Sequence, residues 1–574
     1  MDYRKEYEKW LASPALTAEE HAELEAIKDD DKEIKERFYA PLEFGTAGLR
    51  GTMKMGLHQM NRFVINWATQ GFAEVILEQG KEAMERGVAI CMDCRNHGYE
   101  FAKAAACVMA ANGIKVRLFD ELRPTPELSF AVREYHCIAG INVTASHNPK
   151  EYNGYKVYWE DGAQLPPQHA DQIAKNLEKI DIFTGPKTMD FDEAVKSGMI
   201  TIFGEDCDKR FLEEVMKMVN DYDSVKKVAD TFKVVYTPFH GCGHKLVPEA
   251  LRRLGVKHII CEPEQMKIDG NFPTVVSPNP ENPEGFYLAV DLAKKVDSDL
   301  IIGTDPDSDR VGTMVRDGDR YVTITGNQMG CLLLDYIIQA KKSTGTMPKN
   351  PGALSSIVTT SMVRTICEAN GVHFEDTFTG FKFMAERVAA WEAAGSYEYI
   401  FAFEESYGYM MGDYVRDKDA VSASMMIAEM AAHYHLKGMT LLDALKALYE
   451  KYGYYAEHTL NLVMPGLEGM ARMKQIMDEM RSNPPENIAG EEVLRLRDYK
   501  DGSIAVAGLG KVDKTPFFGS NVLYFELADG SSFIVRPSGT EPKIKVYLLV
   551  RGRDAGECAA KLAKYQDFAE SIGK

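Results

Sequence analysis

The sequence predicts an α/β protein of several domains, three of them similar to one another. Short apolar segments alternate with segments of helix length, and loops rich in Gly, Pro and Asn separate them. This alternation predicts parallel sheets covered by helices on both faces. With 574 residues the chain is too long for one hydrophobic core, and at ~150 residues per domain about four domains are expected.

The predicted elements follow one another in a repeated order. Residues 1–41 are charged throughout and predict a helical N-terminal extension. Strand, loop, helix and strand follow in turn over residues 86–120 and again over 231–260. DSDLIIGTDPDSDR over 297–310, and GALSSIVTT followed by SMVRTICEANGV over 352–372, repeat the pattern. Three related α/β units in series therefore predict an internally repeated domain.

The end of the chain has a different pattern, which predicts an α+β domain. GSIAVAGLG, NVLYFELADGSSFIVRPSG and KIKVYLLVRG read as closely spaced strands, with a hairpin turn at Asp529-Gly530. A helix over residues 555–573 completes the domain, and the polar stretch Met480 to Glu492 is expected to be a loop.

Composition and charge exclude several classes of protein. The formal net charge of −19 argues against a nucleic-acid binder, which would need a basic face. No apolar run reaches the roughly 18 residues of a membrane-spanning helix, and the start lacks the apolar centre of a signal peptide. The ten cysteines are scattered apart from Cys91 and Cys94, so reduced thiols in a cytoplasmic protein are expected.

The stretch VTASHNPKEYNGYK places Ser146 beside His147 in a polar segment, with an expected turn at Asn153-Gly154. Taken alone, the stretch leaves two interpretations open: a nucleophilic serine, or a hydroxyl at an ordinary turn. No G-x-S-x-G motif surrounds Ser146, which disfavours a hydrolase.

Two glycine-rich segments fail as nucleotide-binding motifs. GTAGLRGT has Arg50 where a P-loop needs glycine, and GCGHKL has Leu246 where a dinucleotide fingerprint needs its third glycine. Because its backbone N–H groups flank an arginine, the first segment is better suited to holding an anion.

DPDSDR places Asp305, Asp307 and Asp309 directly after an apolar strand. Three carboxylates so close together repel one another unless a cation lies between them, and a hard divalent ion such as Mg²⁺ prefers such oxygen ligands. The spacing excludes an EF-hand, since Arg310 and Arg316 replace its Gly and Glu. A solvated acidic turn is the alternative interpretation.

Two further loops carry hydrogen-bonding groups. Glu404 and Ser406 in FAFEESYGY could bind the hydroxyl groups of a polyol, or could form a surface turn. RPSGTEPK, residues 536–543, combines an arginine, hydroxyl groups and glycine, which suits a phosphate site better than a plain turn.

Together and in this order, TASHNP, DPDSDR, EES and RPSGTEP resemble the loops of the α-D-phosphohexomutase superfamily, and GTAGLRG, NGYK, DTFTGFK and VRDKDA match as well. The resemblance extends from about Leu42 to the C-terminus. EESYGYMMGDYVRDKDA is similar to the branch of bacterial α-phosphoglucomutases and eukaryotic phosphopentomutase. The phosphomannomutase/phosphoglucomutase branch typically has Gly before the Glu and Gly-His after the Ser, where this chain has Phe403 and Tyr407.

The resemblance implies a role for each loop. Ser146 would carry a phosphoryl group, and it would bind one Mg²⁺ together with the three aspartates. Arg50 and Lys156 would lie beside the transferring group, with Lys156 as the main proton carrier and His147 as the second candidate. Sugar phosphate would be bound by Glu404, Ser406, Lys418, Thr379, Gly380 and Arg310, and the distant phosphate by Arg536, Ser538, Gly539 and Thr540.

The resemblance also implies three related α/β domains and a C-terminal α+β domain around a central cleft. The expected boundaries are 1–41 for the extension, 42–204 for domain I, 205–325 for domain II, 326–452 for domain III and 453–574 for domain IV. The implied reaction interconverts glucose 1-phosphate and glucose 6-phosphate through glucose 1,6-bisphosphate, in a monomer or a homodimer. Alternatives are a phosphopentomutase, a phosphomannomutase, a Mg²⁺-dependent sugar phosphatase and a non-catalytic sugar-phosphate sensor.

Overall fold

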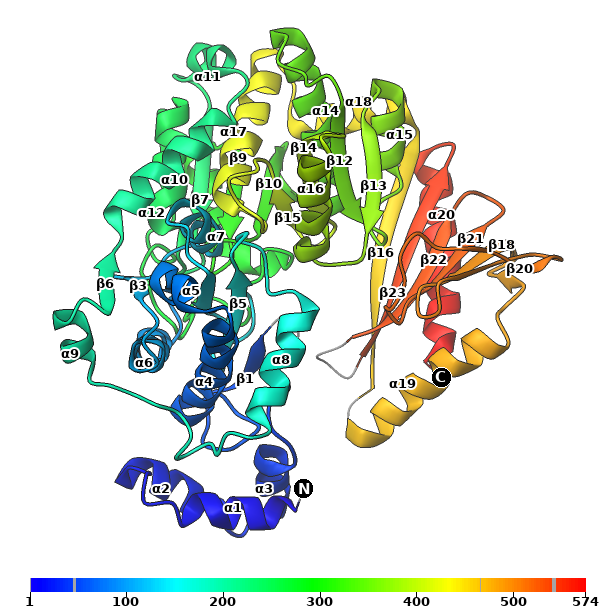
Figure 1. The fold of residues 1–574 in the computed structure, drawn as a ribbon. Coiled ribbons are helices and arrows are strands. Elements are labelled where there is room, and N and C mark those ends of the chain that lie inside the picture. Colours follow the sequence, from blue (N-terminus) through cyan, green and yellow to red (C-terminus); the bar gives the residue numbers. More distant parts are fainter. Residues whose placement is uncertain (1, 45–47, 465, 539–542, 574) are drawn as a thin grey trace. The chain divides into compact units, whose positions relative to one another are not determined.

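The computed structural model describes residues 2–44, 48–464, 466–538 and 543–573, which form two compact units. The first unit holds Met1–Gly326, Gln339–Lys349 and Gly380–Leu441, and the second holds Asn327–Ile338, Asn350–Thr379 and Leu442–Lys574. Helices and strands alternate along most of the first unit, and an antiparallel sheet makes up much of the second (Figure 1).

The N-terminal extension is helical, and its helices are α1 (Tyr3–Leu11), α2 (Ala18–Glu25) and α3 (Asp31–Phe38). Each helix begins after a residue whose side chain accepts backbone hydrogen bonds, namely Asp2, Thr17 and Asp30. Trp10 of α1 is fully buried and contacts Phe38 and Phe63 edge-on. This aromatic cluster attaches the extension to the hydrophobic core that also contains residues of the first sheet.

The first sheet has six strands in the order β1-β5-β4-β2-β3-β6. They are β1 (Leu49–Thr52), β2 (Val88–Met92), β3 (Val116–Phe119), β4 (Ala139–Val143), β5 (Tyr152–Trp159) and β6 (Ile200–Phe203). The predicted parallel pairing is confirmed for β4, β2, β3 and β6. It is wrong for the other two strands, because β5 is antiparallel to β4 and β1 is antiparallel to β5. The connection from β4 to β5, residues 144–151, is too short for the helical crossover that parallel strands require.

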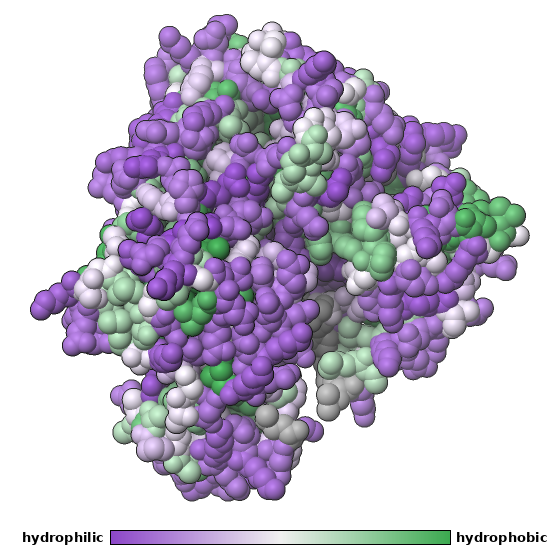
Figure 2. Space-filling view, viewed as in Figure 1, coloured by the Kyte–Doolittle hydropathy of each residue, from purple (hydrophilic) through white to green (hydrophobic). Residues whose placement is uncertain are grey.

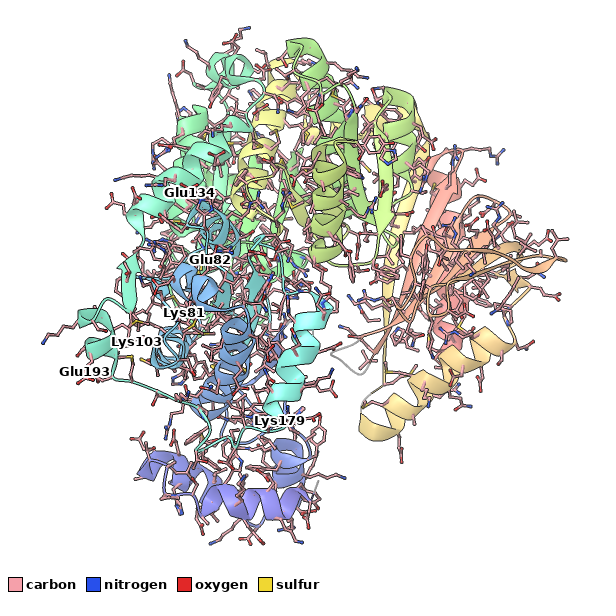
Figure 3. All side chains as sticks on the ribbon, in the orientation of Figure 1. Lys81, Glu82, Lys103, Glu134, Lys179 and Glu193 are labelled. Atoms are coloured by element: carbon pink, nitrogen blue, oxygen red, sulfur yellow. The ribbon has the colours of Figure 1, made fainter. Side chains whose placement is uncertain are left out.

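Helices cover both faces of this sheet. They are α4 (Arg62–Glu78), α5 (Lys81–Arg86), α6 (Gly98–Ala111), α7 (Thr125–Glu134), α8 (Pro167–Leu177) and α9 (Phe191–Lys196). On one face α4 packs against α6 and α8. The short helix α9 is attached to α6, where Lys103 Nζ lies 4.3 Å from the ring centroid of Phe191 (Figure 3).

Helix α7 lies on the opposite face, unusually close to β4. A Cβ atom at Gly140 would lie 2.8 Å from Val132 Cγ2 of α7. Gly140 and Asn142 project to the same face, since side chains alternate along a strand, whereas Ile141 projects into the core beside α4 and α6. The absence of a side chain at Gly140 therefore lets the N-terminal end of α7 approach the carboxyl end of β4.

The second sheet has the order β11-β10-β9-β7-β8. Its strands are β7 (Lys233–Thr237), β8 (His258–Cys261), β9 (Leu300–Thr304), β10 (Val311–Asp317) and β11 (Arg320–Ile324). Its helices are α10 (Glu205–Lys217), α11 (Tyr222–Val228), α12 (Gly243–Leu254), the 3₁₀ helix η1 (Pro283–Phe286) and α13 (Tyr287–Val296). The loop from β9 to β10 carries the three aspartates, so the predicted strand before them is confirmed.

The rest of the first unit follows the same pattern. An antiparallel pair, β14 (Glu398–Glu404) and β15 (Gly408–Met410), lies between α16 (Phe381–Ala394) and α17 (Ala420–Leu436) along the chain.

Figure 2 shows hydrophilic side chains over most of the visible face of the first unit, as the net charge of −19 leads one to expect. All ten cysteine thiols are free, as predicted.

The second unit contains the parallel strands β12 (Pro351–Ser356) and β13 (His373–Thr377), joined by α15 (Met362–Asn370). Helix α18 (Leu441–Tyr452) leads into this unit from the first, and α14 (Gly326–Thr344) has residues in both. An eight-stranded antiparallel sheet then follows the path β16-β23-β22-β21-β18-β19-β20, with β17 paired to β18.

The strands of this sheet are β16 (Tyr454–Val463), β17 (Asn487–Ile488), β18 (Glu491–Asp498), β19 (Ser503–Val506), β20 (Gly510–Lys514), β21 (Leu523–Leu527), β22 (Ser532–Pro537) and β23 (Lys543–Gly552). Two helices accompany it, α19 (Gly466–Ser482) and α20 (Ala555–Ile572). The predicted turn at Asp529-Gly530 is confirmed, with φ of +81° at the glycine. The predicted loop at 480–492 is wrong at both ends, which lie in α19 and β18.

The predicted turn at Asn153-Gly154 is also wrong, because both residues lie inside β5. A Cβ at Gly154 would lie 2.3 Å from the carbonyl oxygen of Thr144 and 2.9 Å from that of Leu49. Glycine is required here by the close approach of neighbouring backbone, which a sequence does not reveal, rather than by turn geometry.

We expect Gly154→Ala to lower the free energy of unfolding by about 1–3 kcal/mol, the usual effect of overpacking, measured by denaturant titration. Gly285→Ala is the matched control, because its Cβ would meet Phe239 at an ordinary contact distance of 3.4 Å. Equal stability of the two variants would contradict the role of close backbone approach.

Candidate active site

Ser146 lies just beyond β4, with its hydroxyl directed at the acidic loop. It is 3% exposed and has a left-handed φ of +51°, a conformation uncommon for residues other than glycine. Its N–H donates to Thr144 Oγ1 at 2.8 Å, and its Oγ donates to Asp305 Oδ2 at 2.9 Å. The structure thus brings together the serine and the acidic triplet that the sequence singled out, although 159 residues separate them.

A buried arginine that the sequence analysis missed holds the serine loop. Arg95 donates hydrogen bonds to the carbonyl oxygens of Ser146, Asn148, Pro149 and Tyr152. The guanidinium satisfies in this way four backbone groups of the serine loop and of the first residue of β5. The sequence shows only that Arg95 follows a strand, in the segment DCRN. The serine loop to which it binds lies more than fifty residues away in the chain.

The guanidinium of Arg95 also faces Asp93, with 3.3 Å between Nε and Oδ2, and both side chains are fully buried. Burial is the main cause that raises the pKa of Asp93 to about 6, and Arg95 opposes it. Arg95 therefore links a buried carboxylate to the serine loop.

Asp305, Asp307 and Asp309 form a buried cluster with exposures of 0%, 0% and 1%. One oxygen from each lies within 4.8 Å of the others. Asp305 Oδ1 accepts the N–H groups of Asp309 and Arg310 at 3.1 and 3.0 Å. The loop therefore folds around the first aspartate.

The residues present fit a divalent cation. Oδ1 of Asp307 and Oδ1 of Asp309 are buried and find no hydrogen-bond donor in the described part of the chain. A buried carboxylate oxygen without a donor is costly unless a cation faces it. The oxygen-only donor set is the one that Mg²⁺ prefers.

Two lysines bring positive charge to the cluster. Lys156 Nζ lies 3.0 Å from Asp307 Oδ2 and 3.6 Å from Asp309 Oδ2. Lys418 Nζ lies 2.8 Å from Asp309 Oδ2. Burial and the two neighbouring carboxylates raise the pKa of Asp305 well above its ordinary value. Burial, the largest single effect, acts to raise the pKa of Asp307, but Lys156, a hydrogen bond with Asp305 and Lys418 together outweigh it and the pKa is lowered.

Arg50 and His147 border the serine. The exposed side chain of Arg50, on β1, donates to Asn148 Oδ1 at 2.9 Å. His147 Nδ1 lies 3.3 Å from Ser146 Oγ. Loss of hydration, followed by the charges of Arg310 and Arg50, lowers the pKa of His147 well below its ordinary value, so its imidazole is neutral at pH 7.

The expected sugar-binding loop packs directly on the acidic loop. Val311 N–H donates to the carbonyl oxygen of Tyr407, and Arg310 pairs with Gly408 as an isolated β-bridge. Glu404, at the end of β14, is 5% exposed and accepts the N–H of Gly380 at 2.5 Å. Glu404, Gly380, Ser406, Arg310 and Lys418 therefore belong to the same unit as Ser146.

Three other predicted residues belong to the second unit. Thr379 lies in the second unit, as do Arg536 and Ser538 at the end of β22. Ser538 N–H donates to the carbonyl oxygen of Lys543 at 2.8 Å. Gly539 and Thr540 lie outside the described residues. Arg310 has a partner that the sequence analysis missed, since its Nη1 donates to Glu281 at 2.6 Å.

Four family domains match this chain in order. They are described as phosphoglucomutase/phosphomannomutase α/β/α domains I, II and III and the C-terminal domain, and they match residues 41–182, 209–318, 325–452 and 489–562. The chain belongs to the phosphoglucomutase/phosphomannomutase family. The predicted superfamily and the predicted fold class, three α/β domains followed by a C-terminal domain, are both confirmed.

Individual members of the family give the same result. A phosphoglucomutase of Staphylococcus aureus strain MRSA252 is 36% identical over 536 residues, which cover 93% of this chain and 94% of the relative. A family protein of Burkholderia thailandensis shares the fold with a TM-score of 0.64 at 19% identity, covering 92% of this chain and 96% of that one. Parafusin, a phosphoglucomutase from Paramecium in an open form, matches with a TM-score of 0.67 at 20% identity, covering 93% and 95%.

As a member of this family, the chain is a phosphohexomutase, an isomerase that acts on small sugar phosphates. No helix in the described part of the chain combines the length and apolar character that a membrane-spanning segment requires.

We expect Arg95→Leu to lower the free energy of unfolding by about 3–5 kcal/mol, because it leaves the buried Asp93 carboxylate without its cation, again measured by denaturant titration. Arg210→Leu is the control, since its ion pairs with Glu134 and Asp206 are exposed and should contribute less than about 1 kcal/mol. A similar loss of unfolding free energy in both variants would contradict the role of Arg95 in holding the serine loop.

Proposed function

We propose that this chain is a phosphoglucomutase that interconverts α-D-glucose 1-phosphate and glucose 6-phosphate. In this proposal Ser146 is the phosphoryl carrier. Phosphoserine transfers its phosphoryl group to the free hydroxyl of the sugar monophosphate and forms glucose 1,6-bisphosphate. The bisphosphate turns over and returns its other phosphoryl group to Ser146.

One observation carries the proposal: Ser146 Oγ lies 2.9 Å from a buried triad of carboxylates. Phosphoryl transfer requires little covalent chemistry from the protein beyond the nucleophile, and depends on alignment and charge neutralisation. Placing a serine oxygen against a cation site supplies both.

The charges around the serine suit a transferring phosphoryl group. Mg²⁺ held by Asp305, Asp307, Asp309 and the Ser146 phosphate would neutralise charge on the phosphoryl oxygens. Lys156 and Lys418 also compensate the charge of the carboxylates. The side chain of Arg50 is exposed on β1 and, among the described side chains, donates only to Asn148, so it would be able to approach a phosphoryl group.

Two residues are candidates for moving the proton. Lys156 Nζ is held by Asp307, whereas His147 Nδ1 lies 3.3 Å from Ser146 Oγ and belongs to a neutral imidazole. The position of Lys156 suits charge compensation and delivery of a proton to the sugar oxygen. His147 is the nearer group to the serine oxygen, so it becomes a stronger candidate than the sequence alone suggested.

Substrate recognition is assigned to two loops. Glu404 and Ser406 would bind sugar hydroxyl groups in both orientations of the bisphosphate, with Gly380, Thr379, Lys418 and Arg310 completing the sugar-phosphate site. RPSGTEPK would hold the phosphate that is not reacting, through Arg536, Ser538, Gly539 and Thr540.

The sugar preference is proposed from the family branch and the S. aureus relative. Phe403 and Tyr407 are the two residues that differ from the phosphomannomutase/phosphoglucomutase branch. Phe403 is fully buried, and its ring centroid lies 5.6 Å from that of Phe401 in a stacked arrangement. Its ring therefore contributes to core packing. Tyr407 is 8% exposed with φ of +67°, and its backbone carbonyl oxygen accepts the N–H of Val311.

We expect Ser146→Ala to lower kcat for glucose 1-phosphate roughly 10³-fold or more, because no other group carries the phosphoryl group. Intact-mass measurement of the wild-type protein should show a phosphate adduct that maps to the Ser146 peptide and is absent from the variant. Ser129→Ala, which removes another buried hydroxyl, is the control and should keep most of the activity.

The products distinguish the proposal from its alternatives. Glucose 6-phosphate supports a mutase, free phosphate a phosphatase, and no product a sensor. A higher kcat/KM for mannose or pentose phosphates would overturn the glucose assignment but not the reaction, and phosphate on His147 would overturn the assignment of the carrier.

We expect Arg536→Ala to raise KM and lower kcat, with a total loss on the order of 2–5 kcal/mol for a desolvated arginine–phosphate contact. Because glucose 1,6-bisphosphate would escape before it turns over, the variant should depend more strongly on added bisphosphate. Arg551→Ala, at an exposed position of β23, is the control. Unchanged KM, kcat and bisphosphate requirement in Arg536→Ala would contradict the phosphate role.

A further inference from the structure

The two oxygens of the Asp307 carboxylate have different surroundings. Oδ2 accepts hydrogen bonds from Lys156 Nζ at 3.0 Å and from Thr125 Oγ1 at 2.8 Å. Oδ1 has no donor among the described residues. Both donors come from the first sheet and its helices, whereas Asp307 belongs to the second sheet's loop. The orientation of the Asp307 carboxylate group is therefore determined by hydrogen-bond donors that lie outside the acidic loop.

Thr125 makes two hydrogen bonds to the acidic loop. It is the first residue of α7, and its N–H donates to the carbonyl oxygen of Asp307 at 2.8 Å. A first-turn N–H has no acceptor within its own helix, so it is available for such a contact. With the hydroxyl on Oδ2, Thr125 binds both the backbone and the side chain of Asp307, and all these groups are fully buried.

A second residue determines the direction of the Thr125 hydroxyl. Asn142 Nδ2 donates to Thr125 Oγ1 at 2.7 Å. Because Oγ1 accepts this hydrogen bond, its own proton is directed to Asp307 Oδ2. Asn142 lies opposite Lys156 in the β4–β5 register. This pair of neighbouring strands therefore supplies Lys156, which donates to Asp307 directly, and Asn142, which acts on Asp307 through Thr125; we call the chain Asn142–Thr125–Asp307 the relay.

The packing of α7 makes this contact possible. Gly140, two residues before Asn142 on the same face of β4, leaves no side chain between the strand and Val132. The close approach brings the start of α7 within reach of Asn142 and of Asp307. Thr125, Asn142 and Asp307 each have an exposure of 0%, which keeps competing water away from these hydrogen bonds.

We propose that Thr125, oriented by Asn142, is a positioning residue that turns the Asp307 carboxylate so that Oδ1 faces the metal. The inference rests on the metal site of the proposed function. Groups that hold a metal ligand in place commonly change metal affinity about 10- to 100-fold when removed. The relay also fixes the acidic loop relative to the serine loop, because β4 leads directly into Ser146.

The test is direct measurement of Mg²⁺ binding to the purified full chain by titration calorimetry. Thr125→Val keeps the shape and the backbone N–H but removes the hydroxyl, and should weaken Mg²⁺ binding at least about tenfold. Thr125→Ser restores the donor and should bind Mg²⁺ within about threefold of wild type. KM for glucose 1-phosphate should change much less than kcat, since the relay does not contact the sugar.

Thr69→Val is the matched control, because the Thr69 hydroxyl is equally buried but donates to Ile65 O in α4. It should leave Mg²⁺ affinity unchanged even if it lowers the melting temperature. If Thr125→Val does not fold, Asn142→Ala takes its place and should weaken Mg²⁺ binding by a smaller factor, about three- to tenfold.

The outcomes separate this inference from the proposed function. Wild-type protein that binds no Mg²⁺ would overturn the metal role itself. Wild-type binding with unchanged affinity in Thr125→Val, or in Asn142→Ala where that variant replaces it, would overturn only the relay. Weakened binding that Thr125→Ser restores supports the relay.

Discussion

The arrangement of the first unit depends on the mutual repulsion of three buried carboxylates. Asp305, Asp307 and Asp309 lie where water cannot solvate them, and removing charges from water is costly unless opposite charges and hydrogen bonds compensate. Lys156 comes from the first sheet and Lys418 from the segment after β15, while backbone N–H groups come from the acidic loop itself. Compensation therefore requires three separate parts of the chain to meet at one point.

The same requirement explains where backbone strain is found. Ser146, Ser308 and Tyr407 have φ values of +51°, +51° and +67°, one in each of the serine, acidic and sugar loops. Such conformations cost on the order of 1–3 kcal/mol each and persist only where the surroundings enforce them. Arg95 supplies that enforcement for the serine loop. The carbonyl oxygens of Ser308 and Tyr407 are held by the N–H groups of Ala420 and Val311.

The positive charges of the site also differ in function. Arg95 is used entirely within the protein, on four carbonyl groups and Asp93. Lys156 and Lys418 compensate the aspartates of the acidic loop, and the exposed Arg50 donates to Asn148 alone among the side chains that the structure describes. In a protein with a net charge of −19, an anionic substrate is attracted by such local positive groups rather than by the field of the whole molecule.

The sequence by itself determined the family, the alternation of strands and helices, and the position of the loops to which the chemistry is assigned, because each is a local pattern of residue types. DPDSDR after an apolar strand predicts its own position at the end of β9. Only the tertiary structure decided that β5 runs antiparallel, that Gly154 lies in a strand, and that Arg95, Thr125 and Asn142 act on distant loops. These features depend on contacts between residues up to 182 positions apart, and no local pattern encodes which distant backbone or carboxylate a side chain will meet.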